Sequence, residues 1–175
     1  MTDNKIALEE HVTVPALDTF SSRGAGHLDR AYVEDMAKRL PDAKLRLEEM
    51  DRYGIATMVL SINTPGIQGI PDASASIEAA QRANDQLAER FVRAYPGRFA
   101  GFAAVPLQDV QAACRELQRA VKDLGFVGAL VNGFSNTGDL DTAQYLDEPP
   151  VWDFWAEVDA LGVPVYLHPR NPLPS

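Results

Sequence analysis

The sequence predicts an α/β fold organised as a partial (β/α)₈ TIM barrel of about five βα units, with residues 1–175 as a single domain. Short apolar segments alternate with longer amphipathic ones, as in βαβ units around a parallel sheet. Polar side chains gather at the C-terminal ends of the apolar segments, where a barrel forms its active-site mouth. No G-x-G-x-x-G turn follows the first segment, which argues against an open dinucleotide-binding sheet.

Five short apolar segments bounded by Gly, Pro, Asn or Asp are predicted as strands. They are Lys5–His11, Thr57–Asn63, Phe99–Leu107, Gly128–Gly133 and Val163–Pro169. Segments with apolar residues at helical spacing lie between them, and Gly54, Gly125 and Gly162 supply C-terminal caps. The predicted helices are Asp42–Tyr53, 74–95, 110–124 and Trp152–Leu161.

Composition narrows the class of protein. The chain has 25 acidic and 16 basic residues, and its net charge of -9 argues against a nucleic-acid partner. No apolar run approaches the roughly 20 residues that span a bilayer, and the N-terminus does not resemble a signal peptide. A single cysteine fits a reducing compartment. We therefore expect a cytoplasmic protein without nucleic-acid or membrane partners.

The motif Glu9-Glu10-His11 ends the first predicted strand. Side chains alternate across a strand, so Glu9 and His11 are expected to share one face while Glu10 points to the other. A carboxylate and an imidazole two residues apart can bind one metal ion. The alternative is a solvated strand end with an incidental histidine, because E-x-H is a short and common pattern.

His168 ends the fifth predicted strand, in VYLHPRNP. In a barrel, side chains at the strand ends converge on one centre. Glu9, His11 and His168 would then offer one oxygen and two nitrogens, a set that suits Zn²⁺ or Mn²⁺. The alternative for His168 is a core imidazole bonded to the backbone.

Several blocks of the sequence resemble the aromatic acid decarboxylases of the amidohydrolase superfamily, and within them the γ-resorcylate (2,6-dihydroxybenzoate) decarboxylases. The blocks follow the order found in that family and extend over nearly the whole chain. They read KIALEEH, TMVLSIN, RANDQLAERFVRAYPGRFAGFAAVPLQD, LGFVGALVNGFS and VPVYLHPRNPLP. Related 2,3-dihydroxybenzoate decarboxylases tend to carry alanine at the first-strand histidine, so His11 favours the γ-resorcylate branch.

The resemblance implies metal-dependent, non-oxidative decarboxylation of a hydroxybenzoate, with γ-resorcylate the favoured substrate. It implies that Glu9, His11 and His168 bind a divalent ion, usually Mn²⁺ or Zn²⁺, and that the protein is a homotetramer. Family members are about twice as long, and their later His and final-strand Asp, the proton donor, have no counterpart in this sequence. The chain is therefore expected to be an N-terminal portion with an unknown catalytic proton donor and doubtful activity on its own. The alternatives are a metal-dependent amide or lactone hydrolase of the same superfamily and a non-catalytic fragment.

Three further residues near strand ends are candidates for binding the aromatic acid. Asn132 follows the fourth strand, and its alternative is a turn-forming Asn beside Gly133. Asn63 ends the second strand beside Pro65-Gly66, and its alternative is likewise that of a turn-forming Asn. Arg170 can pair with a substrate carboxylate, and its alternative is a structural ion pair. His27 lies in a loop that departs from the family pattern, and no role is assigned to it.

Overall fold

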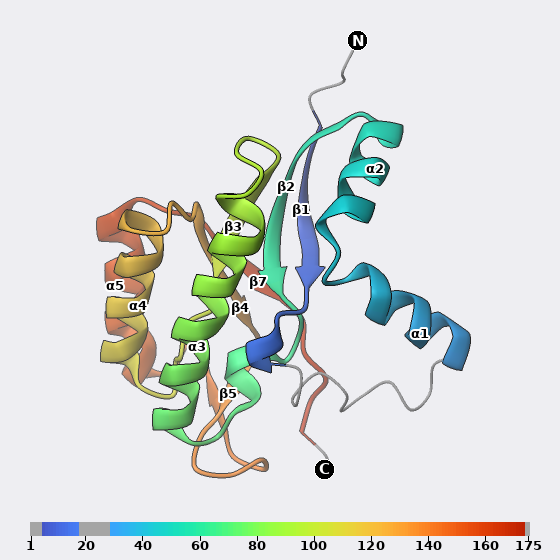
Figure 1. Cartoon of the computed structure of the whole chain (residues 1–175). Coiled ribbons are helices and arrows are strands. Elements are labelled where there is room, and N and C mark those ends of the chain that lie inside the picture. The colour runs from blue at the N-terminus through green and yellow to red at the C-terminus, as the bar shows by residue number, and fades with distance from the viewer. Residues whose placement is uncertain (1–4, 18–28, 174–175) are drawn as a thin grey trace.

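A five-stranded parallel sheet forms the centre of the protein, which is described here as a computed structural model covering residues 5–17 and 29–173 (Figure 1). The strand order is β1-β2-β3-β4-β7, so sequential strands are neighbours and β1 and β7 are the edges. The strands are β1 (Lys5–Val12), β2 (Ile55–Ile62), β3 (Phe99–Ala103), β4 (Gly128–Asn132) and β7 (Val165–His168). All neighbours pair in parallel, as predicted.

Helices connect the successive strands. They are α1 (Arg30–Arg39), α2 (Ala43–Tyr53), α3 (Ala73–Leu87), α4 (Val110–Lys122) and α5 (Trp152–Leu161). The side chains of Asp42, Asp72 and Asp109 accept hydrogen bonds from the first turns of α2, α3 and α4. Figure 1 shows α3, α4 and α5 beside one another, with α2 next to β1 and β2. The long helix predicted over 74–95 is α3 continued by a π-helical turn, Ala88–Val92.

The two faces of the sheet carry different apolar clusters, as alternation along the strands requires. On the outer face, Leu60, Ala103 and Val131 pack in one large core with buried residues of α2 to α5, such as Met50 and Phe154. The inner face carries a smaller cluster, which we call the inner cluster. It consists of Val59, Phe102 and Leu130 with the partly buried Ala100 and Tyr166. Helices on one face and a separate apolar cluster on the other are the arrangement of a barrel wall.

Four features differ from the sequence prediction. Helix α1 was not predicted, and β3 ends at Ala103 instead of Leu107, before Pro106, which has no N–H to donate to a sheet. An antiparallel hairpin of β5 (Phe134–Asn136) and β6 (Ala143–Tyr145) follows β4. Short helical turns were also missed, at Pro15–Leu17, Gly66–Gly69 and Pro149–Val151.

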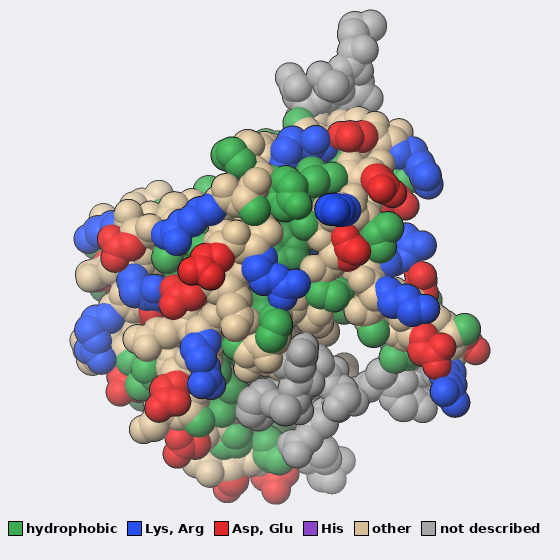
Figure 2. Space-filling model, in the orientation of Figure 1, with side chains coloured by type: hydrophobic (Ala, Val, Ile, Leu, Met, Phe, Trp, Pro, Cys, Tyr) green, Lys and Arg blue, Asp and Glu red, His purple; other side chains and the backbone are tan. Residues whose placement is uncertain are grey.

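Charged side chains are scattered over the face shown in Figure 2. On the face shown in Figure 2, acidic and basic groups are interspersed, in keeping with the composition. Within residues 5–17 and 29–173, no helix is both long enough and apolar enough to cross a membrane.

Gly128 is expected to be intolerant of a side chain. A Cβ atom there would lie 2.2 Å from the carbonyl oxygen of Pro164, just before β7. Because the obstacle is backbone, Gly128→Ala should lower the free energy of unfolding by about 2 kcal/mol, measured by urea denaturation. Gly133→Ala is the matched control, since its Cβ would meet nothing within 4 Å. Equal losses in both variants would contradict the expectation.

Candidate metal centre

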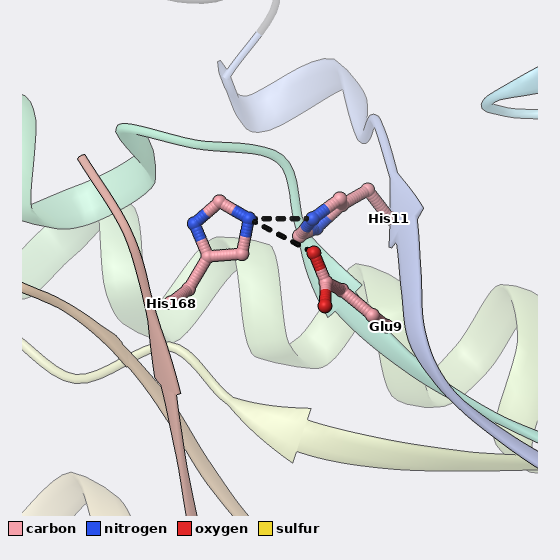
Figure 3. A group of neighbouring side chains, drawn as sticks. All are labelled: Glu9, His11 and His168. Carbon is pink, nitrogen blue, oxygen red and sulfur yellow. Dashed lines mark hydrogen bonds and ion pairs between the residues drawn. The ribbon is translucent and has the colours of Figure 1, made fainter. Parts of the chain in front are cut away.

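Three potential metal ligands meet where the carboxyl ends of the two edge strands approach each other (Figure 3). Glu9 and His11 come from β1, and His168 is the last residue of β7. Nε2 of His11 lies 3.2 Å from Nε2 of His168, and Oε1 of Glu9 lies 3.5 Å from that same atom of His168. The imidazole rings are nearly perpendicular, at 86°, with centroids 4.8 Å apart. The structure thus brings together the three residues that the sequence predicted as ligands.

The cluster has the donor atoms and spacing that a divalent ion requires. One ligand atom from each residue lies within 4.8 Å of the others. In a tetrahedral site with metal–ligand bonds of about 2.0–2.1 Å, neighbouring ligand atoms are about 3.4 Å apart. Two of the three ligand pairs, at 3.2 and 3.5 Å, agree with that value. Two imidazoles and one carboxylate therefore fit Zn²⁺ or Mn²⁺.

Two neighbouring side chains hold the ligands. The hydroxyl of Tyr166 donates a hydrogen bond to Oε2 of Glu9. The hydroxyl oxygen of the fully buried Ser61 lies 3.1 Å from Nδ1 of His11. A contact of this kind fixes the tautomer of a metal-binding histidine and leaves its other nitrogen facing the ion. Nδ1 of His168 is buried without a hydrogen-bond partner among the described residues.

The environment favours the ionisation states that bind metal. The hydrogen bond from Tyr166 is the largest effect and lowers the pKa of Glu9. Desolvation opposes it by a smaller amount, and the nearby His168 and His11 add weaker lowering effects. Burial, followed by the neighbouring His168, lowers the pKa of His11. A carboxylate and a neutral imidazole are the forms in which these groups act as ligands.

Glu10 points to the opposite face of β1, as alternation predicted. Its Oε2 lies 3.4 Å from Nη1 of Arg46 on α2. Nη2 of Arg46 donates a hydrogen bond to the carbonyl of His11. The middle residue of the Glu9-Glu10-His11 motif thus holds the arginine that fixes the backbone of the third.

Asn132 lies at the same end of the sheet, in a hydrogen-bonded network. Its Oδ1 accepts a 2.9 Å hydrogen bond from Thr64, and its carbonyl accepts a 3.0 Å bond from the buried side chain of Gln68. Asn132 also lines a small pocket with Phe102 and Leu130 of the inner cluster. Asn132 is the last residue of β4 and not the turn-forming residue of its alternative, and its hydrogen-bonded side chain lies beside a pocket.

Asn63 and Arg170 contact residues other than the three of the ligand cluster. Asn63 lines a second pocket, formed with Val12–Val14, Leu17, Ile62 and 64–66. The guanidinium carbon of Arg170 lies 4.0 Å from the ring centre of Phe134, and Nη1 donates a 3.1 Å hydrogen bond to the carbonyl of that residue. The remaining hydrogen bonds recorded for Arg170 go to Asn136 and the carbonyl of Gln68, so its contacts are not those of an ion pair. His27 falls outside the described residues.

Sequence reasoning missed the roles of Ser61 and Tyr166, although the strand pattern held a signal for both. Tyr166 precedes His168 by two residues and so shares its face of β7. Ser61 belongs to the inward-facing set of β2, and the strand register places it opposite His11. That register identifies His11 as the partner of Ser61, whereas the contact of Tyr166 with Glu9 joins the two edge strands, which do not pair, and depends on how far the sheet curls.

The fold and the cluster define part of an α/β barrel with a candidate metal centre at the carboxyl ends of its strands. The chain belongs to the amidohydrolase family, whose model matches residues 11–173. It is 54% identical over 172 residues to the γ-resorcylate decarboxylase of Rhizobium radiobacter. A crystal structure of 2,6-dihydroxybenzoate decarboxylase complexed with 2,6-dihydroxybenzoate is 53% identical, with a TM-score of 0.90. A dihydroxybenzoic acid decarboxylase from a Polaromonas species, with bound manganese and the inhibitor 2-nitroresorcinol, is 49% identical, also with a TM-score of 0.90.

These similarities cover nearly all of this chain and half of each relative. The match to the Rhizobium radiobacter enzyme includes 98% of this chain and 51% of that protein, and the two structural matches include 98% of this chain and 52% and 51% of theirs. The chain thus spans about half the length of the curated relatives it matches. The likeness confirms both the predicted partial barrel and the resemblance to the γ-resorcylate decarboxylases.

Proposed function

We propose that the complete protein carrying this chain is a metal-dependent, non-oxidative decarboxylase of a hydroxybenzoate, with γ-resorcylate the favoured substrate. The observation that carries the proposal is the cluster of Glu9, His11 and His168. It occurs in a chain 54% identical to a γ-resorcylate decarboxylase and 53% identical to a 2,6-dihydroxybenzoate decarboxylase crystallised with its substrate. Homotetrameric assembly, implied by the family, and a cytoplasmic location are part of the same proposal.

In this function the three ligands hold Mn²⁺ or Zn²⁺. A divalent ion supplies a Lewis acid and a template that orients a carboxylate and its ortho-hydroxyl. Asn132, Asn63 and Arg170 are proposed to contact the aromatic acid at the mouth. The inner cluster supplies an apolar wall beneath the bound aromatic acid and limits the access of water to the aromatic ring of that acid.

The reaction also requires a proton for the ring carbon that loses CO₂. Two carboxyl groups of this chain, those of Glu10 and Asp139, are the first candidates for its donor. Glu10 is turned toward Arg46, and the carboxylate of Asp139 accepts hydrogen bonds from the backbone of Asp141 and Thr142 in the β5–β6 loop. Neither carboxyl group lies in the ligand cluster. We therefore expect the 175-residue chain, expressed alone, to release no CO₂ from γ-resorcylate.

The test uses the protein expressed from the complete reading frame and loaded with Mn²⁺. We expect CO₂ and resorcinol to form from 2,6-dihydroxybenzoate in equal amounts, and Glu9→Gln to abolish both. Absence of CO₂ together with hydrolysis of an amide or lactone would replace the proposal by its hydrolase alternative. A reading frame that ends at Ser175, with no activity on either substrate class, would favour the alternative of a non-catalytic fragment.

A further inference from the structure

We propose that Tyr166 is a positioning residue of the metal centre, which fixes the carboxylate of Glu9 so that one oxygen is left for the ion. The inference rests on the proposed metal binding and extends it to a residue outside the ligand set. The Tyr166 hydroxyl donates to Oε2 of Glu9, while Oε1 is the oxygen 3.5 Å from Nε2 of His168. Figure 3 shows one Glu9 oxygen directed at His168 and the other turned away. With Oε2 engaged, Glu9 is prepared as a ligand through a single oxygen.

Glu9 needs such support because little else holds it. Its side chain is 51% exposed, whereas that of His168 is 10% exposed. The register of β1 against β2 is irregular between Ala7 and Glu10, so regular pairing does not fix Glu9. A long, exposed carboxylate samples many rotamers, and a ligand that must be ordered on binding weakens affinity.

Tyr166 can provide this support because its own ring is fixed. The ring stacks on Phe102 of the inner cluster, with centroids 6.1 Å apart and planes at 29°. Tyr166 pairs with Leu130 in the β4–β7 register, and Leu130 belongs to the same cluster. The ring of Tyr166, held by the inner cluster, thus restrains the exposed side chain of Glu9 on another strand.

The hydrogen bond also joins the two edge strands. Tyr166 and His168 lie two residues apart on β7, and Glu9 is on β1. The strand that supplies one ligand therefore also sets the position of another. The distance between the Glu9 oxygen and the His168 nitrogen depends on the internal geometry of β7 as well as on the packing of β1.

The test compares Mn²⁺ affinity in Tyr166→Phe and the unmodified protein, by calorimetry or chelator competition. Phenylalanine keeps the stacking on Phe102 and removes only the hydroxyl. We expect the dissociation constant to rise about 10–100-fold, the range observed when a residue supporting a metal ligand is lost. Tyr145→Phe is the matched control, because Tyr145 also packs on a phenylalanine, Phe134, with ring centroids 5.7 Å apart. The Mn²⁺ affinity of the Tyr145→Phe variant should not change.

Two further measurements separate positioning from a merely structural role. The apo form of Tyr166→Phe should keep its thermal midpoint, and the variant should alter the electron paramagnetic resonance spectrum of bound Mn²⁺. In a Glu9→Ala background, Tyr166→Phe should cause no additional loss of affinity, because the side chain that it holds is already absent. Unchanged Mn²⁺ affinity in Tyr166→Phe, or equal losses in both backgrounds, would overturn the inference. If the complete protein releases no CO₂ but these changes in Mn²⁺ affinity are observed, the proposed reaction is refuted and the role of Tyr166 stands.

Discussion

Replacing Glu9 by glutamine is expected to raise the dissociation constant for Mn²⁺ by more than about 100-fold, since loss of a direct ligand should exceed the 10–100-fold effect of losing a supporting residue. The same change at Glu10 is expected to leave the affinity unchanged. Glu9 faces His168, whereas Glu10 faces Arg46 on the other side of β1. Glutamine has nearly the same shape as glutamate. A difference between the Glu9→Gln and Glu10→Gln variants therefore reflects the charge and orientation of the side chain and not its size.

The measurement is a calorimetric titration of each variant with Mn²⁺, repeated with Zn²⁺. Glu10→Gln retains a side-chain oxygen that can accept from Arg46, and its fold should be preserved. A comparable loss of affinity in both variants would mean that the ion depends on the net charge of the strand end and not on the cluster. Full affinity in Glu9→Gln would remove Glu9 from the ligand set.

The alternation of strand side chains was enough to predict much of this site. It placed Glu9 and His11 on one face and Glu10 on the other, and the structure agrees. The end of the fifth strand placed His168 at the same mouth. The contacts of Ser61 and Tyr166 could not be predicted in this way, because they depend on strand register and on how far the sheet curls. Local sequence does not encode either quantity.

The fold was predictable where burial imposes a pattern. The five parallel strands and helices α2 to α5 have an apolar face and were found. Helix α1 has no buried residue, so packing against the core contributes little to it. It is supported instead by the N-cap of Asp29 and by i,i+4 ion pairs of 2.8 Å between Arg30 and Glu34 and 2.7 Å between Arg39 and Asp35. The strands β5 and β6 are three residues each, too short to show a period.

Replacing Arg46 by methionine is expected to lower the free energy of unfolding by about 3 kcal/mol, the lower end of the cost of breaking a buried ion pair. The Arg46 side chain is 11% exposed and that of Glu10 29% exposed, so the charge left behind is partly shielded by solvent. The change also removes the donor to the carbonyl of His11. Because that bond holds the backbone of a ligand, Mn²⁺ affinity should fall about tenfold as well.

Urea denaturation and Mn²⁺ titration of a double-mutant cycle separate the two consequences. Adding Glu10→Gln to Arg46→Met removes the orphaned charge, so part of the lost stability should return. The metal affinity should not return, because the carbonyl of His11 still lacks its donor. Arg39→Met is the control, since Arg39 is 55% exposed in its pair with Asp35 and should cost no more than about 1 kcal/mol. Recovery of both properties in the double variant would show that Arg46 acts through charge balance alone and does not hold the backbone of His11.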